Sequence, residues 1–290
     1  MIVIPGSANP RLSEDLSRHL PGARLLTPEV KRFPDGEVYV RVPEAVRGEH
    51  VTIVQGTFPN DNLIELLLLQ DACERAGARR ITSVVPYLAY ARQDTLFKPG
   101  ESVSMEILAR CMALQAHDVI TIDPHKEHIL RFFGGKAKSV SAVPEIASYL
   151  RTHAKPDLLL APDKGALPRV EEAATLLRID FDYLEKRRIS GTEVEMKPKA
   201  LDVSGRRVAI LDDMISTGGT MATAIRQLKD QGASYVAAAC THGLFVGGAP
   251  ERLRAAGCDA VLATDTLEGA NALIPAAPAV LRALVQTVPS

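Results

Sequence analysis

The chain has 290 residues, of which 46% are apolar, and its formal net charge is −1. This length allows one large domain or two domains of about 150 residues, with enough apolar residues for a substantial core. The near-neutral charge and the lack of a basic arm argue against a nucleic-acid partner, and no apolar run reaches the roughly 18 residues that cross a bilayer, so we expect no membrane partner.

Short β-rich runs alternate with longer helical patterns along the chain. Most of these runs are continuously apolar, which is typical of parallel strands that are covered on both faces. The pattern predicts an α/β fold in which parallel sheets are flanked by helices. The expected strands are 2–4, 51–55, 81–85, 119–122, 158–161, 208–211, 236–239 and 261–263.

The first ten residues, MIVIPGSANP, lack the charged start and apolar stretch of a signal peptide. They indicate a strand that is followed by a Gly-Ser turn. Four scattered cysteines without a C-x-x-C pair favour buried free thiols and argue against a zinc site. We therefore expect a cytoplasmic protein. The cysteines are Cys73, Cys111, Cys240 and Cys258.

Two stretches depart from this pattern. EVYVRV at 37–42 alternates between polar and apolar residues, which predicts a half-exposed antiparallel flap. Residues 186–204 are charged and irregular, and we expect them to form a mobile excursion over a site.

Residues 51–88 and 208–244 resemble each other. Each stretch contains an apolar strand, a polar turn, a helix that ends at a Gly-Ala pair, and a second strand. Gly77 and Gly232 lie where a helix C-terminal cap is expected. Any two strand–helix–strand units share some of these features, but the matched spacing favours two related domains, 1–145 and 146–290. The last residues of the second domain are expected to pack back on the first.

The turn of the second copy reads DDMISTGGT where the first copy has QGTFPNDN. In a parallel sheet this turn lies at the carboxyl end of its strand, where ligands bind in open α/β folds. A helix is expected to begin near Thr220. Its unpaired N–H groups, the threonine hydroxyls and two adjacent glycines would suit a phosphate monoester. The second domain is therefore expected to bind the phosphorylated substrate.

Asp212 and Asp213 cannot contact the same phosphate, because like charges repel. They are expected to face hydrogen-bond donors or a cation, and a ribose diol and Mg²⁺ both meet this requirement. Together with the phosphate cradle they indicate a ribose 5-phosphate site; the alternative is a solvated acidic turn before an ordinary helix N-cap. The expected contacts are Asp212, Asp213, Ser216, Thr217, Gly218, Gly219 and Thr220.

The apolar strand, the D-D pair and the T-G-G-T turn together resemble the phosphoribosyl-pyrophosphate loop of type I phosphoribosyltransferases and ribose-phosphate pyrophosphokinases. Further segments resemble the latter family in the same order, over essentially the whole chain, and most closely its shorter archaeal-type branch. The resemblance implies two tandem domains of the type I phosphoribosyltransferase kind, with β flaps. These segments are RFPDGEVYV (32–40), PYLAYARQD (86–94), TIDPHKEHI (121–129), LLAPDKGA (159–166), DYLEKRRISGTEVEM (182–196) and ACTHGLF (239–245).

The resemblance implies a Mg²⁺-dependent transfer of the pyrophosphoryl group of ATP to the anomeric hydroxyl of ribose 5-phosphate. The products would be 5-phosphoribosyl 1-pyrophosphate and AMP. Such a transfer depends on in-line positioning and charge neutralisation. The alternatives are a phosphoribosyltransferase, which consumes this pyrophosphate, and a catalytically silent relative that regulates an active partner.

The mobile catalytic loop of the family carries a Lys-x-Arg pair that matches Lys186 and Arg188, whereas Arg187 is expected to be dispensable. A lysine point charge and an arginine fork suit the phosphate oxygens of the transition state. His125, in DPH, matches the family histidine that meets the ATP phosphates or their Mg²⁺. Asp163, in PDKG, is a second candidate for Mg²⁺ or for ribose. A solvated basic run and an ordinary loop histidine remain the alternatives.

The remaining matches concern ATP. The ARQD segment follows a strand of the first domain, where its arginine is expected to stack on adenine or pair with phosphate. The family places the FPDGE flap against the ATP of a neighbouring subunit, which implies a homo-oligomer with at least two subunits. The expected ATP-binding residues are Phe33, Asp35, Glu37, Arg92, Gln93 and Asp94.

Overall fold

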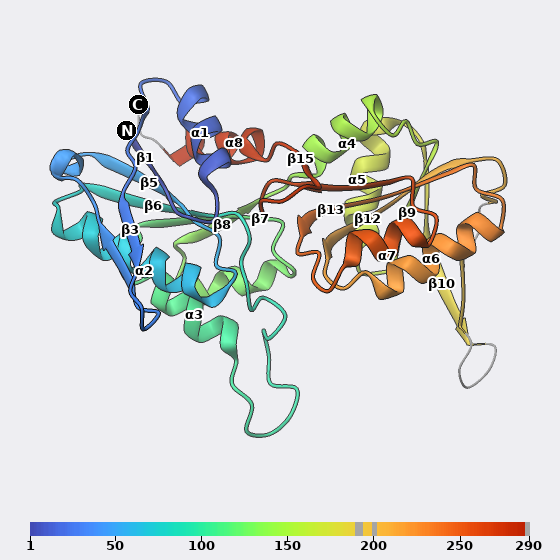
Figure 1. Ribbon diagram of the computed structural model, residues 1–290, viewed down its shortest axis with the longest axis horizontal. Helices are drawn as coiled ribbons and strands as arrows, with labels where there is room; N and C mark the ends of the chain where they lie inside the picture. The colour runs from blue at the N-terminus through green and yellow to red at the C-terminus, as the bar shows by residue number, and fades with distance from the viewer. Residues whose placement is uncertain (189–193, 199–201, 288–290) are drawn as a thin grey trace. The chain divides into compact units, whose positions relative to one another are not determined.

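The computed structural model describes residues 1–188, 194–198 and 202–287, and Figure 1 shows its helices and strands. The chain divides into two compact units. The N-terminal unit comprises Met1–Ser141, Asp265–Glu268 and Ala276–Ser290, and the C-terminal unit comprises Ala142–Thr264 and Gly269–Pro275. The first boundary lies at 141/142, close to the 145/146 expected from the sequence, and the C-terminal residues from Ala276 belong to the N-terminal unit, as does the short stretch Asp265–Glu268.

The N-terminal unit is built on a parallel sheet with the strand order β2-β1-β5-β6-β7-β8. Figure 1 shows α1 and α8 on one side of this sheet and α2 and α3 on the other. Both faces are therefore covered, which explains why β5 is buried along its whole length. The strands are β1 (Ile2–Pro5), β2 (Arg24–Leu25), β5 (His50–Val54), β6 (Arg80–Val85), β7 (Asp118–Ile122) and β8 (Ala137–Val140).

The apolar stretch at 63–70 lies in α2, where Leu66 and Leu69 are buried against the sheet. Among the residues that the structure describes, no helix has the length and apolarity needed to cross a membrane. The helices of this unit are α1 (Pro10–His19), α2 (Asn60–Arg75), α3 (Ser104–Met112) and α8 (Ala277–Thr287), with 3₁₀ turns η1 (Glu44–Val46) and η2 (Glu127–Phe133).

The C-terminal unit has the strand order β11-β10-β9-β12-β13-β14-β15, and it is parallel except for the antiparallel pair β10–β11. In Figure 1, α4 and α5 lie on one side of the sheet and α6 and α7 on the other. The strands are β9 (Leu158–Ala161), β10 (Asp180–Arg188), β11 (Val194–Pro198), β12 (Arg207–Ile215), β13 (Tyr235–Gly243), β14 (Ala260–Thr264) and β15 (Ala272–Ile274). The helices are α4 (Val143–Thr152), α5 (Leu167–Leu177), α6 (Gly219–Asp230) and α7 (Ala249–Ala255).

The two sheets share one strand order, because β2-β1-β5-β6-β7-β8 corresponds to β10-β9-β12-β13-β14-β15. The helix that follows the third strand of each order ends in the same way. Gly77 has φ +83° and its carbonyl accepts from Gly48 N–H at 2.8 Å; Gly232 has φ +91° and its carbonyl accepts from Gly205 N–H at 2.8 Å. These left-handed glycines are the predicted C-terminal caps, and the shared detail supports two related domains.

All eight predicted strands are present, with ends that differ by a few residues. The flap is also confirmed: β3 (Glu29–Arg32) pairs antiparallel with β4 (Val38–Arg41), whose residues alternate in exposure. The expectation of an irregular excursion at 186–204 is wrong for 186–188 and 194–198, which form the regular hairpin β10–β11. This hairpin could not be predicted from the sequence because charged residues are uncommon in strands and strand preference depends strongly on context.

We predict that Gly232→Ala lowers the melting temperature by a few degrees. The φ of +91° is unfavourable for alanine, and the added Cβ would lie 3.3 Å from Ser204 Oγ, a combined cost of about 1 kcal/mol. Gly269→Ala is the control, since position 269 needs no positive φ and its Cβ would meet nothing within 4 Å. Thermal unfolding followed by circular dichroism measures both variants, and equal melting temperatures would contradict the cap.

Candidate active site

The predicted phosphate loop joins β12 to α6. Strand β12 continues to Ile215, four residues beyond its predicted end, so Asp212 and Asp213 lie on the strand and the loop itself is short. The helix begins at Gly219, within one residue of the prediction. Thr217, Gly219 and Thr220 are exposed, and no side-chain oxygen caps the helix in this described segment. The first N–H groups of α6 are therefore open to an anion.

The two glycines of the loop have different roles. Gly218 has φ +70°, and a Cβ there would lie 3.3 Å from Leu253 and 3.4 Å from Ala249 on α7. Gly219 needs no positive φ, and its Cβ position faces open space. Glycine at 218 is thus required by the fold, whereas at 219 it keeps the entrance to the helix N-terminus clear.

Arg252 on α7 braces this loop. Its guanidinium donates hydrogen bonds to the carbonyl of Thr217 and, at 3.0 Å, to the carbonyl of Gly247. The arginine was not predicted as a site residue. No sequence signal could have found it, because it lies more than 30 residues from the loop and reaches it only through the packing of α6 on α7.

The two adjacent aspartates form a strained electrostatic pair. Asp213 is only 6% exposed. Burial and the neighbouring charge of Asp213 raise the pKa of Asp212 to about 7, partly offset by the backbone N–H of Asp213 and by Arg169 on α5. The N–H groups of Asp213 and Met214 donate to Asp212 Oδ1 and Asp213 Oδ1, each at 2.8 Å. The pair would gain from a cation or from hydroxyl donors.

Asp163 follows β9, which lies next to β12 in the sheet, so it belongs to the same carboxyl edge. Its side chain is exposed, and Oδ1 accepts from the N–H groups of Gly165 at 2.8 Å and Ala166 at 3.3 Å. These bonds fix the turn into α5 and orient the carboxylate.

The Lys-x-Arg pair lies on β10, which joins the same sheet beside β9. The backbone of Lys186 pairs with Met196, and that of Arg188 pairs with Val194. The side chains of this pair lie outside the part that the structure describes.

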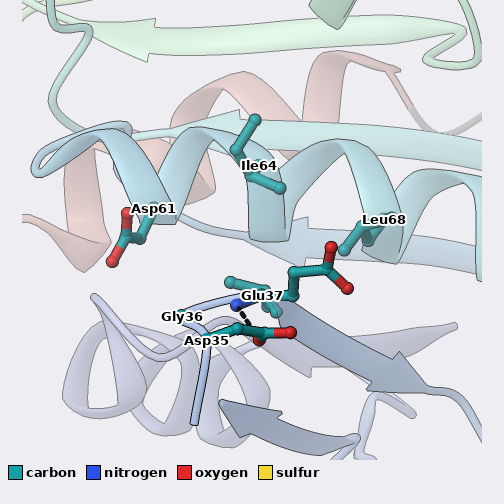
Figure 2. A pocket seen from close by; sticks show the side chains of 7 residues that line it. Asp35, Gly36, Glu37, Asp61, Ile64 and Leu68 are labelled. Carbon is teal, nitrogen blue, oxygen red and sulfur yellow. Dashed lines mark hydrogen bonds between the residues drawn. The ribbon is translucent and has the colours of Figure 1, made fainter. Parts of the chain in front are cut away.

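The flap of the N-terminal unit carries the predicted ATP residues at its tip. Phe33 is 48% exposed, and its ring meets Tyr39 edge-on at a centroid distance of 6.1 Å. Asp35 Oδ1 accepts from Glu37 N–H at 3.1 Å and shapes the turn. Figure 2 shows Asp35 and Glu37 facing α2 across an open hollow. It has a volume of about 530 Å³ and is lined by Asp35, Gly36, Glu37, Val38, Asp61, Ile64 and Leu68.

The three residues Arg92, Gln93 and Asp94 of the ARQD segment differ in exposure and in hydrogen bonding. Arg92 is exposed, as expected for a residue that binds a ligand. Gln93 Nε2 instead donates to Thr95 O, to Ser102 O and to Glu101 Oε2, each at 3.3 Å, and so ties its own loop together. Asp94 is 1% exposed and its carboxylate contacts other parts of the chain. Of the three residues, Arg92 is the most exposed and Asp94 the most buried.

His125 is half-exposed just after β7, at the carboxyl edge of the N-terminal sheet. Lys126 Nζ and His128 Nε2 both lie 2.9 Å from Asp94 Oδ2. Burial alone would raise the pKa of Asp94, but the hydrogen bond and the charge of Lys126 lower it below its ordinary value. The carboxylate therefore stays ionised beside its two partners.

Within residues 1–188, 194–198 and 202–287, no group of three or more His, Cys, Asp or Glu side chains is arranged to hold a metal ion. Such a cluster is typical of a site formed by protein ligands alone. Mg²⁺ in phosphoryl-transfer sites uses one or two carboxylates, water and substrate phosphates instead. Asp163 and the Asp212–Asp213 pair fit that smaller donor set.

Comparison with known proteins agrees with the fold and the loop. Residues 1–115 match the family model described as the N-terminal domain of ribose phosphate pyrophosphokinase, and residues 136–262 match the phosphoribosyl transferase domain model. The chain is 42% identical to the ribose-phosphate pyrophosphokinase of Methanopyrus kandleri, over 98% of both chains. It is 44% identical to that of Thermococcus kodakarensis, over 90% of this chain and 93% of the relative.

A solved structure extends the match to three dimensions. The phosphoribosylpyrophosphate synthetase of Mycobacterium smegmatis superposes with a TM-score of 0.85, 29% identity and 99% coverage of both chains. The similarity thus includes both units.

We predict that Asp212→Asn removes a pH dependence of stability. The native pKa of Asp212 is about 7, against roughly 4 in an unfolded chain. Between these values the folded state holds a proton that the unfolded state has released, so the free energy of unfolding falls as pH rises. The advantage of the variant over the wild type should therefore be smallest at pH 5 and should grow by at most about 1.4 kcal/mol for each pH unit up to about pH 7. At pH 8 the variant should melt several degrees above the wild type.

Calorimetry of the ligand-free protein at pH 5, 6, 7 and 8 measures this difference. Asp163→Asn is the control, because it removes an exposed carboxylate from the same edge of the sheet. A constant difference between Asp212→Asn and wild type across this range would contradict the raised pKa.

Proposed function

The chain belongs to the ribose-phosphate pyrophosphokinase family, and we propose that it transfers the pyrophosphoryl group of ATP to ribose 5-phosphate. The single observation that carries the proposal is the β12–α6 loop. It places an open helix N-terminus beside the half-buried Asp212 and the buried Asp213, within a chain that matches this family over 98% of its length. The products are 5-phosphoribosyl 1-pyrophosphate and AMP.

Ribose 5-phosphate is bound by the two halves of the loop. Its phosphate receives hydrogen bonds from the N–H groups at the start of α6 and from the hydroxyls of Ser216, Thr217 and Thr220. Its ribose diol donates to Asp212 and Asp213, which reduces the cost of keeping two carboxylates together. This division leaves the anomeric hydroxyl outside the cradle, where it can react.

The transfer exchanges one P–O bond for another. The anomeric oxygen forms a bond to the β-phosphorus of ATP, the bond from that phosphorus to the α–β bridging oxygen breaks, and AMP leaves. The anomeric hydroxyl gives up its proton, which passes to the solvent. Because charge spreads over the phosphate oxygens during this step, positioned cations stabilise it more than any covalent intermediate would. Lys186 and Arg188 on β10 supply those cations.

ATP is assigned to the N-terminal unit. Arg92 is exposed and His125 is half-exposed just after β7, and we assign both residues to the phosphates of ATP. Phe33, Asp35 and Glu37 border adenine and its ribose from the flap of a neighbouring subunit, so the active form contains at least two copies of the chain. The exposed ring of Phe33 and the open hollow beside the flap support this assignment.

Mg²⁺ is the proposed metal, and Asp163 and His125 are the residues proposed to bind it. Hard oxygen donors suit this ion, and the buried aspartate pair is a further source of negative charge. When bound, Mg²⁺ would neutralise the phosphate oxygens of ATP. The protein contributes the oriented Asp163 carboxylate, which two backbone N–H groups hold in place.

We also assign the enzyme to the cytoplasm. Cys73, Cys111, Cys240 and Cys258 are all free thiols in the structure. Burial raises the pKa of Cys73 to about 12 and that of Cys258 to about 11, so both thiols are protonated and inert at neutral pH. Such thiols suit a reducing compartment.

The test is ³¹P NMR of the purified protein with Mg-ATP and ribose 5-phosphate. AMP together with a new pyrophosphate ester, both absent when either substrate is omitted, would support the proposal. ADP with a simple phosphate ester would indicate an ordinary kinase. No turnover, but binding of added phosphoribosyl pyrophosphate, would favour a phosphoribosyltransferase or a silent regulatory relative.

We predict that Lys186→Ala lowers kcat at least 100-fold, because one positioned charge on the transferring group contributes about 3 kcal/mol. Binding of ribose 5-phosphate, measured by calorimetry, should be unchanged. Arg187→Ala is the matched control on the same strand and should keep most of the turnover. Equal losses in the two variants would mean that the hairpin needs positive charge in general and not the Lys-x-Arg spacing.

We predict that Gly219→Ala raises KM for ribose 5-phosphate about 10-fold with little change in melting temperature. Alanine fits the backbone at 219, but its methyl group narrows the approach to the first N–H groups of α6. Gly269→Ala, in an equally open position away from the loop, should leave KM unchanged. Steady-state kinetics and thermal unfolding measure both effects, and an unchanged KM for Gly219→Ala would place the phosphate elsewhere.

A further inference from the structure

The carboxylate of Asp94 is the most deeply buried acidic group of the N-terminal unit that pairs with cations. The residue is 1% exposed, and Oδ2 lies 2.9 Å from both Lys126 Nζ and His128 Nε2. Its Oδ1 is also buried and has no hydrogen-bond partner in the described part of the chain. Neither oxygen is therefore open to a nucleotide.

Both partners of Asp94 belong to the short segment that carries His125. This segment runs from the end of β7 into η2, with Lys126 directly after His125 and His128 three residues after it. A buried carboxylate is costly without partners, so the pairing strongly favours one position of the segment. Lys126 and His128 thus attach the segment to Asp94 at two points on the C-terminal side of His125.

Strand β8 holds the same segment at two other points. The N–H of Asp123 donates to Val140 O at 3.0 Å, and Ser139 Oγ donates to Glu127 Oε1 at 2.6 Å. Asp123 adopts φ +37°, an unfavourable value for a non-glycine residue that a flexible loop would relax. His125 therefore lies between Asp123, which is held on its N-terminal side, and the held residues Lys126, Glu127 and His128 on its C-terminal side.

The loop that carries Asp94 is itself fixed. Gln93 N–H donates to Tyr90 O at 3.0 Å, and the Gln93 carbonyl accepts from Met105 N–H at 3.2 Å, where α3 begins. The side-chain amide of Gln93 bridges to Thr95 and Ser102. The hydrogen bonds of the neighbouring Gln93 therefore fix the position of Asp94, so that Asp94 can fix another segment.

We propose that Asp94 is a positioning residue, whose buried carboxylate holds the His125 segment in place through Lys126 and His128. This differs from the ATP contact that the sequence suggested for Asp94. The inference rests on the proposed role of His125 in meeting ATP. It gives Lys126 and His128 the structural role of pairing with Asp94, without a contact to substrate.

The test is a double-mutant cycle between Asp94→Asn and His125→Ala, with kcat and KM for ATP measured at saturating ribose 5-phosphate. Asp94→Asn should lower kcat roughly 10- to 100-fold, as loss of a supporting contact to a functional residue does. The double variant should be no less active than His125→Ala alone, because the support matters only while His125 is present. Calorimetric binding of ribose 5-phosphate should be unchanged.

Two results would overturn the inference in distinguishable ways. If the losses multiply in the double variant, Asp94 acts independently of His125, while the proposed reaction stands. If His125→Ala is fully active, the proposed role of His125 fails and the inference fails with it.

A second variant covers the case in which Asp94→Asn does not fold. The side chains of Lys126 and His128 are 45% and 38% exposed, so Lys126→Gln combined with His128→Gln should fold. Wild-type kcat in this variant would overturn the proposal. A reduced kcat would support it if the variant that also carries His125→Ala is no less active than His125→Ala alone. Asp118→Asn is the control, since Asp118 accepts two bonds from Arg80 at the opposite end of β7, and any loss there should multiply with His125→Ala.

Discussion

Parallel pairing of β9, β12 and β13 is the constraint on which the candidate active site depends. Parallel strands end at one edge of their sheet, so residues more than 40 positions apart in sequence, such as Asp163 and Asp212, belong to that edge. The same geometry starts α6 beside the aspartates and leaves its N–H groups open. Two neighbouring carboxylates that are largely removed from solvent repel each other when both are ionised. This repulsion and the loss of solvation raise the pKa of Asp212. A substrate with a diol at one end and a phosphate at the other satisfies both parts at once.

The corresponding turn of the N-terminal unit is bonded differently. After β5, Gln55 stands where the other unit begins its aspartate pair, and its side chain accepts from Ala8 N–H at 2.9 Å and donates to Asn62 O at 3.3 Å. Asn9 Oδ1 accepts from Gly56 N–H at 2.7 Å. The polar groups of this turn are satisfied by the chain itself, so the turn is closed. One fold, used twice, thus gives an open cradle in one unit and an internally bonded turn in the other.

Sequence reasoning was most accurate where a local rule applied. The continuous apolar runs marked the parallel strands, the Gly-Ala pairs marked two helix ends, and T-G-G-T marked a helix N-terminus to within one residue. It was least accurate where burial decides. It expected an irregular segment where β10 and β11 form a hairpin, and it could not foresee the different burial of the three ARQD residues. The structure exposes Arg92, engages Gln93 in its own loop and buries Asp94, a distinction that depends on segments distant in sequence.

The sequence by itself determined the class of fold, the repeat and the chemistry of the β12–α6 loop. These features follow from residue type and spacing, which set backbone preference and hydrogen-bonding capacity within a few residues. Only the tertiary structure decided that Arg252 braces the loop, that Asp213 is buried beside the half-buried Asp212, and that Asp94 meets Lys126 and His128. Desolvation and pairing depend on which distant segments are packed together, and a linear pattern contains no measure of that distance.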